Sequence, residues 1–249
     1  MELDLEGKVA IVTGASRGLG RAAAEALAAE GANVLAVARA TPDLEKLQAA
    51  NPERIAIETV DMRSAEQVAA LAEHAVARFG RLDVVVNNAG IAPAGRFVDQ
   101  PQEEWDEVFA VNVRAPAVLA RAAGRYFLEQ RSGKVINVAS TSGINGKPVL
   151  VSYSASKGAV LQFTKALGAE WARFGVQVTA IAPGAFETDA QSAVLEDPQT
   201  LERRLRKIPA GRMGRGDEFG PLVCYLASSL SDFMTGSVIV FDGGEVNKL

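Results

Sequence analysis

The chain has 249 residues, of which 48% are apolar and 22% charged, a composition typical of a folded domain and not of a disordered chain. A length of about 250 residues suits one large α/β domain. Twenty-six basic and 30 acidic side chains leave a net charge of −4, which argues against a nucleic-acid partner bound through its phosphates.

The chain has one cysteine and one histidine, Cys224 and His74. They exclude an internal disulfide framework and an ordinary zinc site, so we expect no metal. His74 lies in an amphipathic stretch and is expected on a helix surface. The longest uncharged stretches, 174–186 and 219–231, have 13 residues each, fewer than the about 20 that a membrane-spanning helix needs. The first residues resemble no signal peptide, so we expect a soluble cytoplasmic protein with no membrane partner.

Short β-branched runs alternate with longer amphipathic runs along the chain. Strands are predicted at Val9–Val12, Asn33–Val37, Ile55–Val60, Val84–Asn87, Lys134–Val138, Gln177–Ile181 and Ser237–Val240. Helices are predicted near 18–30, 64–79, 103–130, 152–174 and 217–229. Most of the strands are apolar without alternation, as in strands covered on both faces. The pattern predicts one α/β domain over residues 1–249, a Rossmann fold with a doubly wound, seven-stranded parallel sheet and helices on both faces.

One segment, residues 185–210, lacks strong periodicity. It contains an acidic turn at Glu196-Asp197-Pro198 and a basic run at 203–207. It follows the sixth strand, and ligands bind at the carboxyl ends of strands in such sheets. We therefore expect this segment to be a mobile lid over the substrate; the alternative is a plain surface excursion.

A glycine-rich turn follows the first strand, with Gly14, Gly18 and Gly20 in the spacing G-x-x-x-G-x-G. Glycine permits a tight turn and lets backbone N–H groups approach a pyrophosphate, while the next helix adds its positive N-terminus. At the first strand–helix junction of an α/β chain, this pattern indicates a dinucleotide site. It lacks the G-K-S/T ending of a P-loop, which makes ATP or GTP a poor alternative.

Further motifs occur in a fixed order after this turn. They are Asp61, Asn87-Asn88-Ala89-Gly90, Asn112, Ser140, Tyr153-Ser-Ala-Ser-Lys157, Pro183-Gly184 with Thr188, and Asp242-Gly243-Gly244. In this order and at these spacings, they resemble the short-chain dehydrogenase/reductase family over the whole chain. The resemblance implies an NAD(P)-dependent oxidoreductase that transfers a hydride between nicotinamide and a carbonyl or secondary alcohol.

The nucleotide preference is expected from the end of the second strand. An NAD enzyme needs an acid there to bind the ribose 2′-OH, and Ala38 is not one. Arg39 follows it, and Arg17 lies in the glycine turn; two guanidinium groups suit a 2′-phosphate. The sequence therefore favours NADP(H). The alternative is that Arg39 is a solvated strand-end residue and NAD(H) is used.

Tyr153 and Lys157 are four residues apart on a predicted helix, and this spacing places both side chains on one face. A nearby ammonium lowers the pKa of a phenol, so Lys157 is expected to make Tyr153 a usable proton donor and acceptor. Ser140 ends a strand and could hold a substrate carbonyl by a hydrogen bond.

The resemblance implies further roles for single positions. Asn112 would support a proton relay, Lys157 would also hold the nicotinamide ribose, and Asp61 with Met62 would contact adenine. A backbone group at Phe186, together with Thr188, would contact the carboxamide. The full predicted cofactor site is Gly14, Ser16, Arg17, Gly18, Leu19, Gly20, Arg39, Asp61, Met62, Asn88, Ala89, Gly90, Tyr153, Lys157, Pro183, Gly184, Phe186 and Thr188.

The substrate is less clear from the sequence. The predicted pocket is Ser140, Ser142, Asn145, Tyr153 and Ala185. With Lys147 nearby, this mixture of small, polar and cationic residues suits a small polar or sugar-acid-like ketone. The C-terminal half resembles sugar-acid members of the family, such as gluconate 5-dehydrogenase and 2-dehydro-3-deoxygluconate 5-dehydrogenase, and also 3-oxoacyl-acyl-carrier-protein reductase.

Three other functions stay open at this point. One is reduction of a 3-oxoacyl group on an acyl carrier protein. Another is a catalytically silent nucleotide-binding regulator, against which the complete set Asn112, Ser140, Tyr153 and Lys157 argues. The third is an epimerase or dehydratase, whose relatives are usually longer. The family resemblance also implies a homotetramer.

Overall fold

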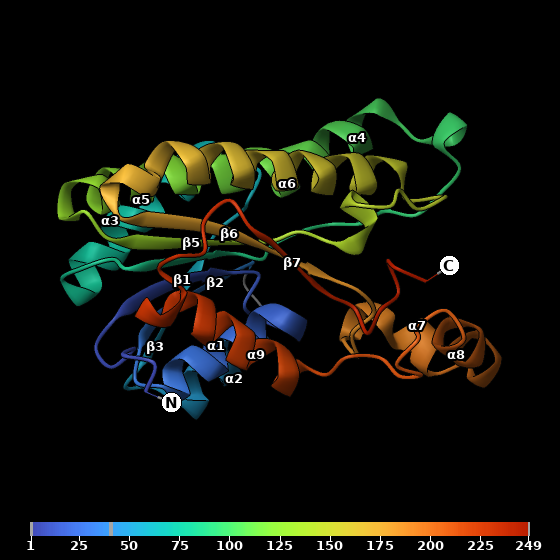
Figure 1. Cartoon of the computed structure of the whole chain (residues 1–249), viewed down its shortest axis with the longest axis horizontal. Coiled ribbons are helices and arrows are strands. Elements are labelled where there is room, and N and C mark those ends of the chain that lie inside the picture. Colours follow the sequence, from blue (N-terminus) through green and yellow to red (C-terminus); the bar gives the residue numbers. More distant parts are fainter. Residues whose placement is uncertain (1, 40–41, 249) are drawn as a thin grey trace.

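A single parallel sheet of seven strands forms the centre of the molecule, in the order β3-β2-β1-β4-β5-β6-β7 (Figure 1). The computed structural model describes residues 2–39 and 42–248. The strands are β1 (Val9–Thr13), β2 (Asn33–Ala38), β3 (Ile55–Thr59), β4 (Val84–Asn87), β5 (Gly133–Val138), β6 (Val176–Pro183) and β7 (Val238–Phe241). Every residue of β1, β4 and β5 is buried, which explains why their sequences are mostly apolar and do not alternate. The predicted sheet is confirmed.

Helices cover both faces of this sheet, and the apolar core lies in two layers between sheet and helices. Helices α3, α4, α5 and α6 lie on one face, and α1, α2 and α9 on the other (Figure 1). Helices α7 and α8 lie beside the sheet near the end of the chain that is marked C. The bounds are α1 (Gly18–Ala29), α2 (Pro42–Ala50), α3 (Ala65–Phe79), α4 (Gln102–Phe109), α5 (Ala115–Gln130), α6 (Val151–Trp171), α7 (Ser192–Leu195), α8 (Pro198–Leu205) and α9 (Gly216–Ala227).

Three elements differ from the sequence prediction. Helix α2 was not predicted, because only Leu44 and Leu47 of its nine residues are buried and its periodic signal is weak. The helix predicted over 103–130 is divided by a π-helical turn, Ala110–Arg114, into α4 and α5. The segment 185–210 contains the short helices α7 and α8, neither of which has a buried residue in its span.

Strands β2 and β3 extend the sheet on one side of β1. The chain then crosses to the other side of β1, where β4 pairs with it, so the strand order reverses at this point. In open parallel sheets, the carboxyl ends of the strands form a crevice at such a switch point. Asn88, just after β4, spans it: its Nδ2 donates to the carbonyls of Thr13 at 2.9 Å and Gly14 at 3.2 Å. The fold therefore places the glycine turn and the Asn-Asn-Ala-Gly motif against each other.

Within the described part of the chain, no helix combines the length and apolar character required to cross a bilayer. Among the same residues, no cluster of His, Cys, Asp and Glu is arranged to hold a metal ion. His74 lies on α3 with an exposed side chain, and its Nδ1 is 2.6 Å from Glu58 Oε1. The predicted surface position of His74 is confirmed.

Candidate active site

A cavity of about 510 Å³ follows the carboxyl edge of the sheet across the switch point. It is lined by the glycine turn, the ends of β2 through β6, and the first turns of α6. Its lining brings together most of the residues predicted from sequence: Gly14, Ser16, Arg17, Gly18, Leu19, Arg39, Asp61, Met62, Asn88, Ala89, Gly90, Ser140, Tyr153, Lys157, Pro183, Gly184, Phe186 and Thr188.

The glycine turn has the geometry that the sequence predicts. Gly14 and Gly18 have φ values of 67° and 55°, a region that side chains with a Cβ rarely adopt. A Cβ on Gly14 would lie 2.8 Å from Asn88 Nδ2, and one on Gly20 would collide with the Gly14 carbonyl. These glycines therefore permit the close packing of the turn against β4.

The start of α1 is open to an anion. Its N-cap residue, Arg17, makes no side-chain capping hydrogen bond, and the first turn holds no acidic residue. The first N–H groups of α1 are thus left for a ligand and lie where the helix dipole favours negative charge. The cavity extends from this point to Tyr153 and Lys157. A dinucleotide fits this arrangement, with its pyrophosphate at α1 and its nicotinamide near α6.

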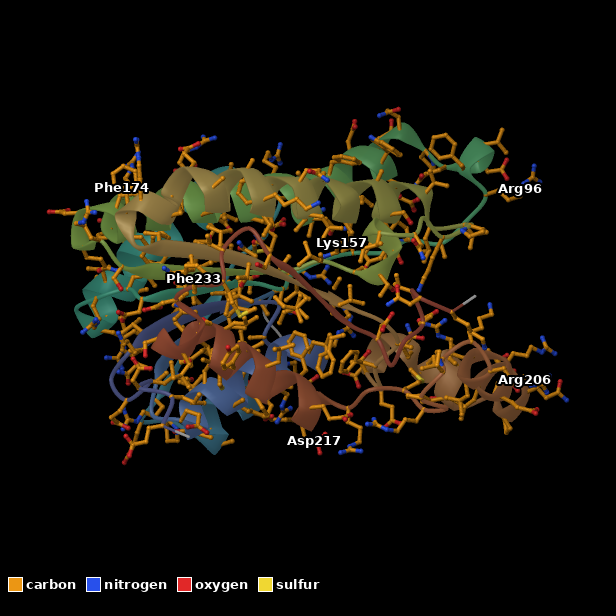
Figure 2. All side chains as sticks on the ribbon, viewed as in Figure 1. Arg96, Lys157, Phe174, Arg206, Asp217 and Phe233 are labelled. Atoms are coloured by element: carbon orange, nitrogen blue, oxygen red, sulfur yellow. The ribbon has the colours of Figure 1, made fainter. Side chains whose placement is uncertain are left out.

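Helix α6 carries Tyr153 and Lys157, and β5 ends just before Ser140. The Lys157 ammonium is buried under α6, where Nζ donates to the Val138 carbonyl at 2.6 Å (Figure 2). Nζ lies 5.7 Å from the centroid of the Tyr153 ring. Ser140 Oγ accepts a hydrogen bond from Ser142 N at 3.1 Å, and the Ser140 hydroxyl is also hydrogen-bonded to Tyr153. The structure brings the predicted catalytic side chains together.

The expected depression of the Tyr153 pKa is wrong for the chain by itself. Burial raises the pKa of Tyr153, and a hydrogen bond with Ser140 opposes this rise. The Lys157 ammonium, which is held at the Val138 carbonyl, does not reverse this rise. Burial also lowers the pKa of Lys157 to about 8.

Asn112 lies in the π-helical turn between α4 and α5 and is 1% exposed. Its Oδ1 accepts from Ile91 N at 2.9 Å, and its Nδ2 donates to the Ile91 carbonyl at 2.9 Å and to Ser156 Oγ at 3.0 Å. Asn112 therefore links the segment after β4 to Ser156 on α6, which is the residue before Lys157. Single π turns occur often at functional sites.

At the nucleotide end, Arg17 and Arg39 both line the cavity and are both exposed. Sequence reasoning missed a third charged residue here, Asp43, which lines the same cavity from the start of α2. Its signal was hidden because α2 has little periodicity. Asp43 pairs with Lys46 at 3.0 Å, and Lys46 chiefly lowers the pKa of its carboxyl.

Asp61 is engaged by a residue that sequence reasoning also missed. Arg63 binds the Asp61 carboxylate with Nε at 2.9 Å and Nη2 at 2.7 Å, and this hydrogen bonding lowers the pKa of Asp61. Arg63 Nη1 also reaches Glu107 Oε1 at 3.3 Å. All three side chains line the cavity beside buried Met62. A carboxylate followed two residues later by an arginine was the available signal.

At the opposite end, the segment after β6 returns across the site. Phe186 is buried, with its ring against Phe219 and Phe241 at centroid distances of 5.9 and 5.4 Å. Its side chain belongs to the core, so only its backbone is available for the predicted carboxamide contact. A Cβ on Gly18 would lie 3.4 Å from Thr188, which places Thr188 beside the glycine turn.

Three predicted substrate residues, Ser142, Asn145 and Ala185, are not among the residues that line this cavity. Ser142 is 3% exposed, and its backbone N–H donates to Ser140 Oγ, which caps the turn. Asn145 is exposed and donates to the Val246 carbonyl at 3.2 Å. Ala185 packs with Ile208 and Met213 in a small apolar cluster. Their contact with substrate stays a prediction.

The buried ammonium of Lys157 makes stability depend on pH. Its folded-state pKa of about 8 lies below the ordinary value of 10.5, so the unfolded chain binds more protons between these values. We expect the free energy of unfolding, measured against Lys157→Met to cancel other groups, to rise by about 2 kcal/mol from pH 8 to pH 10. Urea unfolding of both proteins at each pH checks this. A difference that stays constant or falls with pH would contradict it.

Comparisons with known proteins agree with this geometry. A family model described as Enoyl-(Acyl carrier protein) reductase matches residues 14–245. The chain is 38% identical over 248 residues to the 2-dehydro-3-deoxy-D-gluconate 5-dehydrogenase of Bacillus subtilis, covering 98% of this chain and 96% of that protein. It is 36% identical to the 3-oxoacyl-acyl-carrier-protein reductase of Thermotoga maritima, covering 97% and 99%.

One of the similar solved structures that contain a nucleotide has NADP bound at a sequence identity of 35%. It is described as a putative 2-deoxy-D-gluconate 3-dehydrogenase from Agrobacterium tumefaciens with bound NADP. It superposes with a TM-score of 0.90 at 35% identity, covering 99% of each chain. The likeness extends over the whole molecule, including every element that lines the cavity.

Proposed function

The chain belongs to the short-chain dehydrogenase/reductase family of oxidoreductases, and from this premise we propose that it is an NADP(H)-preferring reductase of a small polar or sugar-acid-like ketone. The observation that carries the proposal is the meeting of Tyr153, Ser140 and buried Lys157 at one end of a cavity that begins at the glycine turn. This is the donor set that hydride transfer to a carbonyl requires.

In this mechanism, a bound nicotinamide supplies or accepts the hydride. Ser140 Oγ donates a hydrogen bond to the substrate oxygen and orients the carbonyl. Tyr153 transfers the proton to that oxygen. Lys157 provides the nearby positive charge, and the bonds of Asn112 to Ser156 and Ile91 hold the adjoining segments in place.

The preference for NADP(H) is supported by Arg17 and Arg39 on the cavity wall and by Ala38 in place of an acid. The Agrobacterium tumefaciens relative is a structure with bound NADP. Asp43 on the same wall opposes the two cations, so the preference is a balance of charges in which NAD(H) use is retained.

The substrate class is supported by the named activities of the relatives. The Bacillus subtilis protein is named for a sugar acid, and an acyl-carrier-protein thioester is the second candidate because of the Thermotoga maritima protein. A rate assay separates them: NADPH oxidation is followed with a panel of 5-keto sugar acids, simple ketones and an acetoacetyl thioester. The proposal expects the highest kcat/KM for a sugar acid, and no turnover of any carbonyl would refute it.

We also propose that residues 185–210 form a lid that orders over the substrate. Helices α7 and α8 contain no buried residue, and Gln191 of the same segment lines the cavity. Hydrogen exchange of amides in this segment is expected to slow by about 10-fold or more when cofactor and substrate are both added. The central strand β4 serves as the control. Equal exchange in 185–210 with and without ligands would contradict the proposal.

The remaining parts of the proposal concern assembly and location. We propose a cytoplasmic homotetramer with a small-molecule substrate and no nucleic-acid partner. Exposed apolar side chains beside β7, notably Phe233, support a buried contact between copies. Sedimentation at several concentrations measures the oligomeric state.

A further inference from the structure

Three segments that are far apart in the sequence meet at one carboxylate. Glu245 lies in the segment of residues 242–248 that follows β7. Its carboxylate accepts hydrogen bonds from both terminal nitrogens of the Arg204 guanidinium, on α8, at 2.6 and 2.7 Å. Lys147, in the segment after Ser140, lies 3.7 Å from the same carboxylate. The Glu245 and Arg204 side chains are only 13% and 19% exposed. Most other ion pairs of the described chain have at least one partner that is far more exposed.

The segment 242–248 presents Glu245 from a fixed backbone. Asp242 accepts hydrogen bonds from Gly244 N at 2.8 Å and Val246 N at 2.6 Å, which closes a turn around Glu245. The Gly243 carbonyl accepts from Ala210 N at 3.0 Å. A Cβ on Gly243 would lie 2.9 Å from Ile208, so the turn packs directly against the chain that follows α8.

Helix α8 connects Glu245, which binds Arg204, to one wall of the proposed substrate site. Leu201 and Leu205, on either side of Arg204, pack against a cluster that contains Ala185. Ala185 belongs to the segment that returns across the site after β6. Arg204 therefore lies on the same helix as the two side chains that pack against that segment.

Lys147 leads from the same carboxylate to the opposite wall. Its backbone N–H donates to Ser154 Oγ at 3.1 Å, and Ser154 is the next residue after Tyr153. Asn145, two residues earlier, donates to the Val246 carbonyl. Both walls of the site are thus tied to the segment 242–248.

We propose that Glu245 is a positioning residue for substrate binding: through Arg204 and Lys147 it holds the lid helix α8 and the segment after Ser140 at a fixed separation. The inference rests on the proposed function, because it takes the space between these walls as the substrate site. A forked pair of low exposure is well suited to this role, since it fixes orientation as well as distance. Glu245 is not among the residues that line the cofactor cavity, so its replacement is expected to leave cofactor binding nearly unchanged.

The test compares Glu245→Gln with Arg206→Gln. Arg206 belongs to the same helical region but pairs with Glu202 at 2.7 Å on an exposed face, where both side chains are at least 66% exposed. Figure 2 shows Arg206 pointing away from the body of the molecule. For Glu245→Gln, KM for the ketone is expected to rise by about 10-fold, with kcat changed less than about 3-fold and the NADPH Kd less than about 2-fold. Arg206→Gln is expected to leave all three unchanged.

A mutant cycle with Arg204→Gln shows whether the two residues act as a unit. The double variant is expected to raise KM no further than either single variant. If Glu245→Gln does not fold, Arg204→Lys retains the charge without the fork and is expected to raise KM by about 3-fold. A KM within 2-fold of the wild type for the folded variants, or an equal rise for Arg206→Gln, overturns the inference.

Hydrogen exchange of α8 without substrate provides a readout that does not need activity. Its amides are expected to exchange about 10-fold faster in Glu245→Gln, with α9 unchanged. If the wild type reduces no carbonyl of the panel, the proposed function fails, and unchanged exchange of α8 then overturns the inference independently.

Discussion

Replacing Tyr153 by phenylalanine is expected to lower kcat by about 100-fold or more while leaving NADPH affinity within about 2-fold of the wild type. The substitution removes only the hydroxyl that transfers the proton. The ring remains 5.7 Å from Lys157 Nζ, so the ammonium keeps its surroundings and its bond to the Val138 carbonyl. Steady-state kinetics and fluorescence titration of NADPH measure the two quantities.

Tyr225→Phe is the matched control. Its hydroxyl lies at the surface, 3.4 Å from the Leu230 carbonyl, so losing it should not alter turnover. Near wild-type turnover of Tyr153→Phe would remove Tyr153 from the proton transfer. An equal loss of turnover in Tyr225→Phe would indicate that both substitutions act by lowering the stability of the protein.

The double replacement Ala38→Asp with Arg39→Ala is expected to lower the ratio of kcat/KM for NADPH over NADH by at least about 100-fold, equivalent to about 2.7 kcal/mol. Arg39 lines the cavity at the end of β2, and its loss removes a donor for the 2′-phosphate. The new carboxylate at position 38 repels the phosphate and accepts the 2′-OH of NADH.

Added salt should shrink this effect, because Arg17 and Arg39 are exposed and their charges are screened. Arg78→Ala removes an equally exposed arginine from α3 and should leave the ratio unchanged. A wild type that already prefers NADH, or a double variant with an unaltered ratio, would identify Arg39 as a solvated strand-end residue.

The sheet was predictable because its inner strands are buried on both faces, so that their sequences are mostly apolar and do not alternate with polar residues. The strand predicted at Val9–Val12 extends over Val9–Thr13, and the one predicted at Val84–Asn87 has those bounds. The π turn at Ala110–Arg114 was not predictable in this way. A single shifted hydrogen bond hardly changes the helical spacing of apolar residues before and after the turn. Helix α8 shows no strong periodic pattern of apolar residues in its sequence, because it packs only Leu201 and Leu205 against a small cluster.

The catalytic residues could be found because a spacing of four on a helix fixes which face they share. The pKa shifts at the site could not be predicted, because they depend on burial and on the positions of individual charged atoms, which residue spacing does not give. Lys157 directs its ammonium to the Val138 carbonyl, and burial of Tyr153 then outweighs the nearby charge. In the same way, residue spacing does not reveal that Arg63, in the turn after β3, and Asp43, at the start of α2, line the cavity.

The position of β1 between β2 and β4 has a consequence for how the folded state is held together. Strands β1, β2 and β3 come from the first 59 residues, and β4 to β7 from the remainder, so β1 and β4 form the seam between two halves of the chain. The cavity draws its lining from both halves. A dinucleotide bound across this seam binds only the assembled chain, and at 100 times its Kd it would add about 2.7 kcal/mol to the free energy of unfolding. The ligand would thereby stabilise the contact between the two halves, and the fraction of folded protein would follow the cofactor supply.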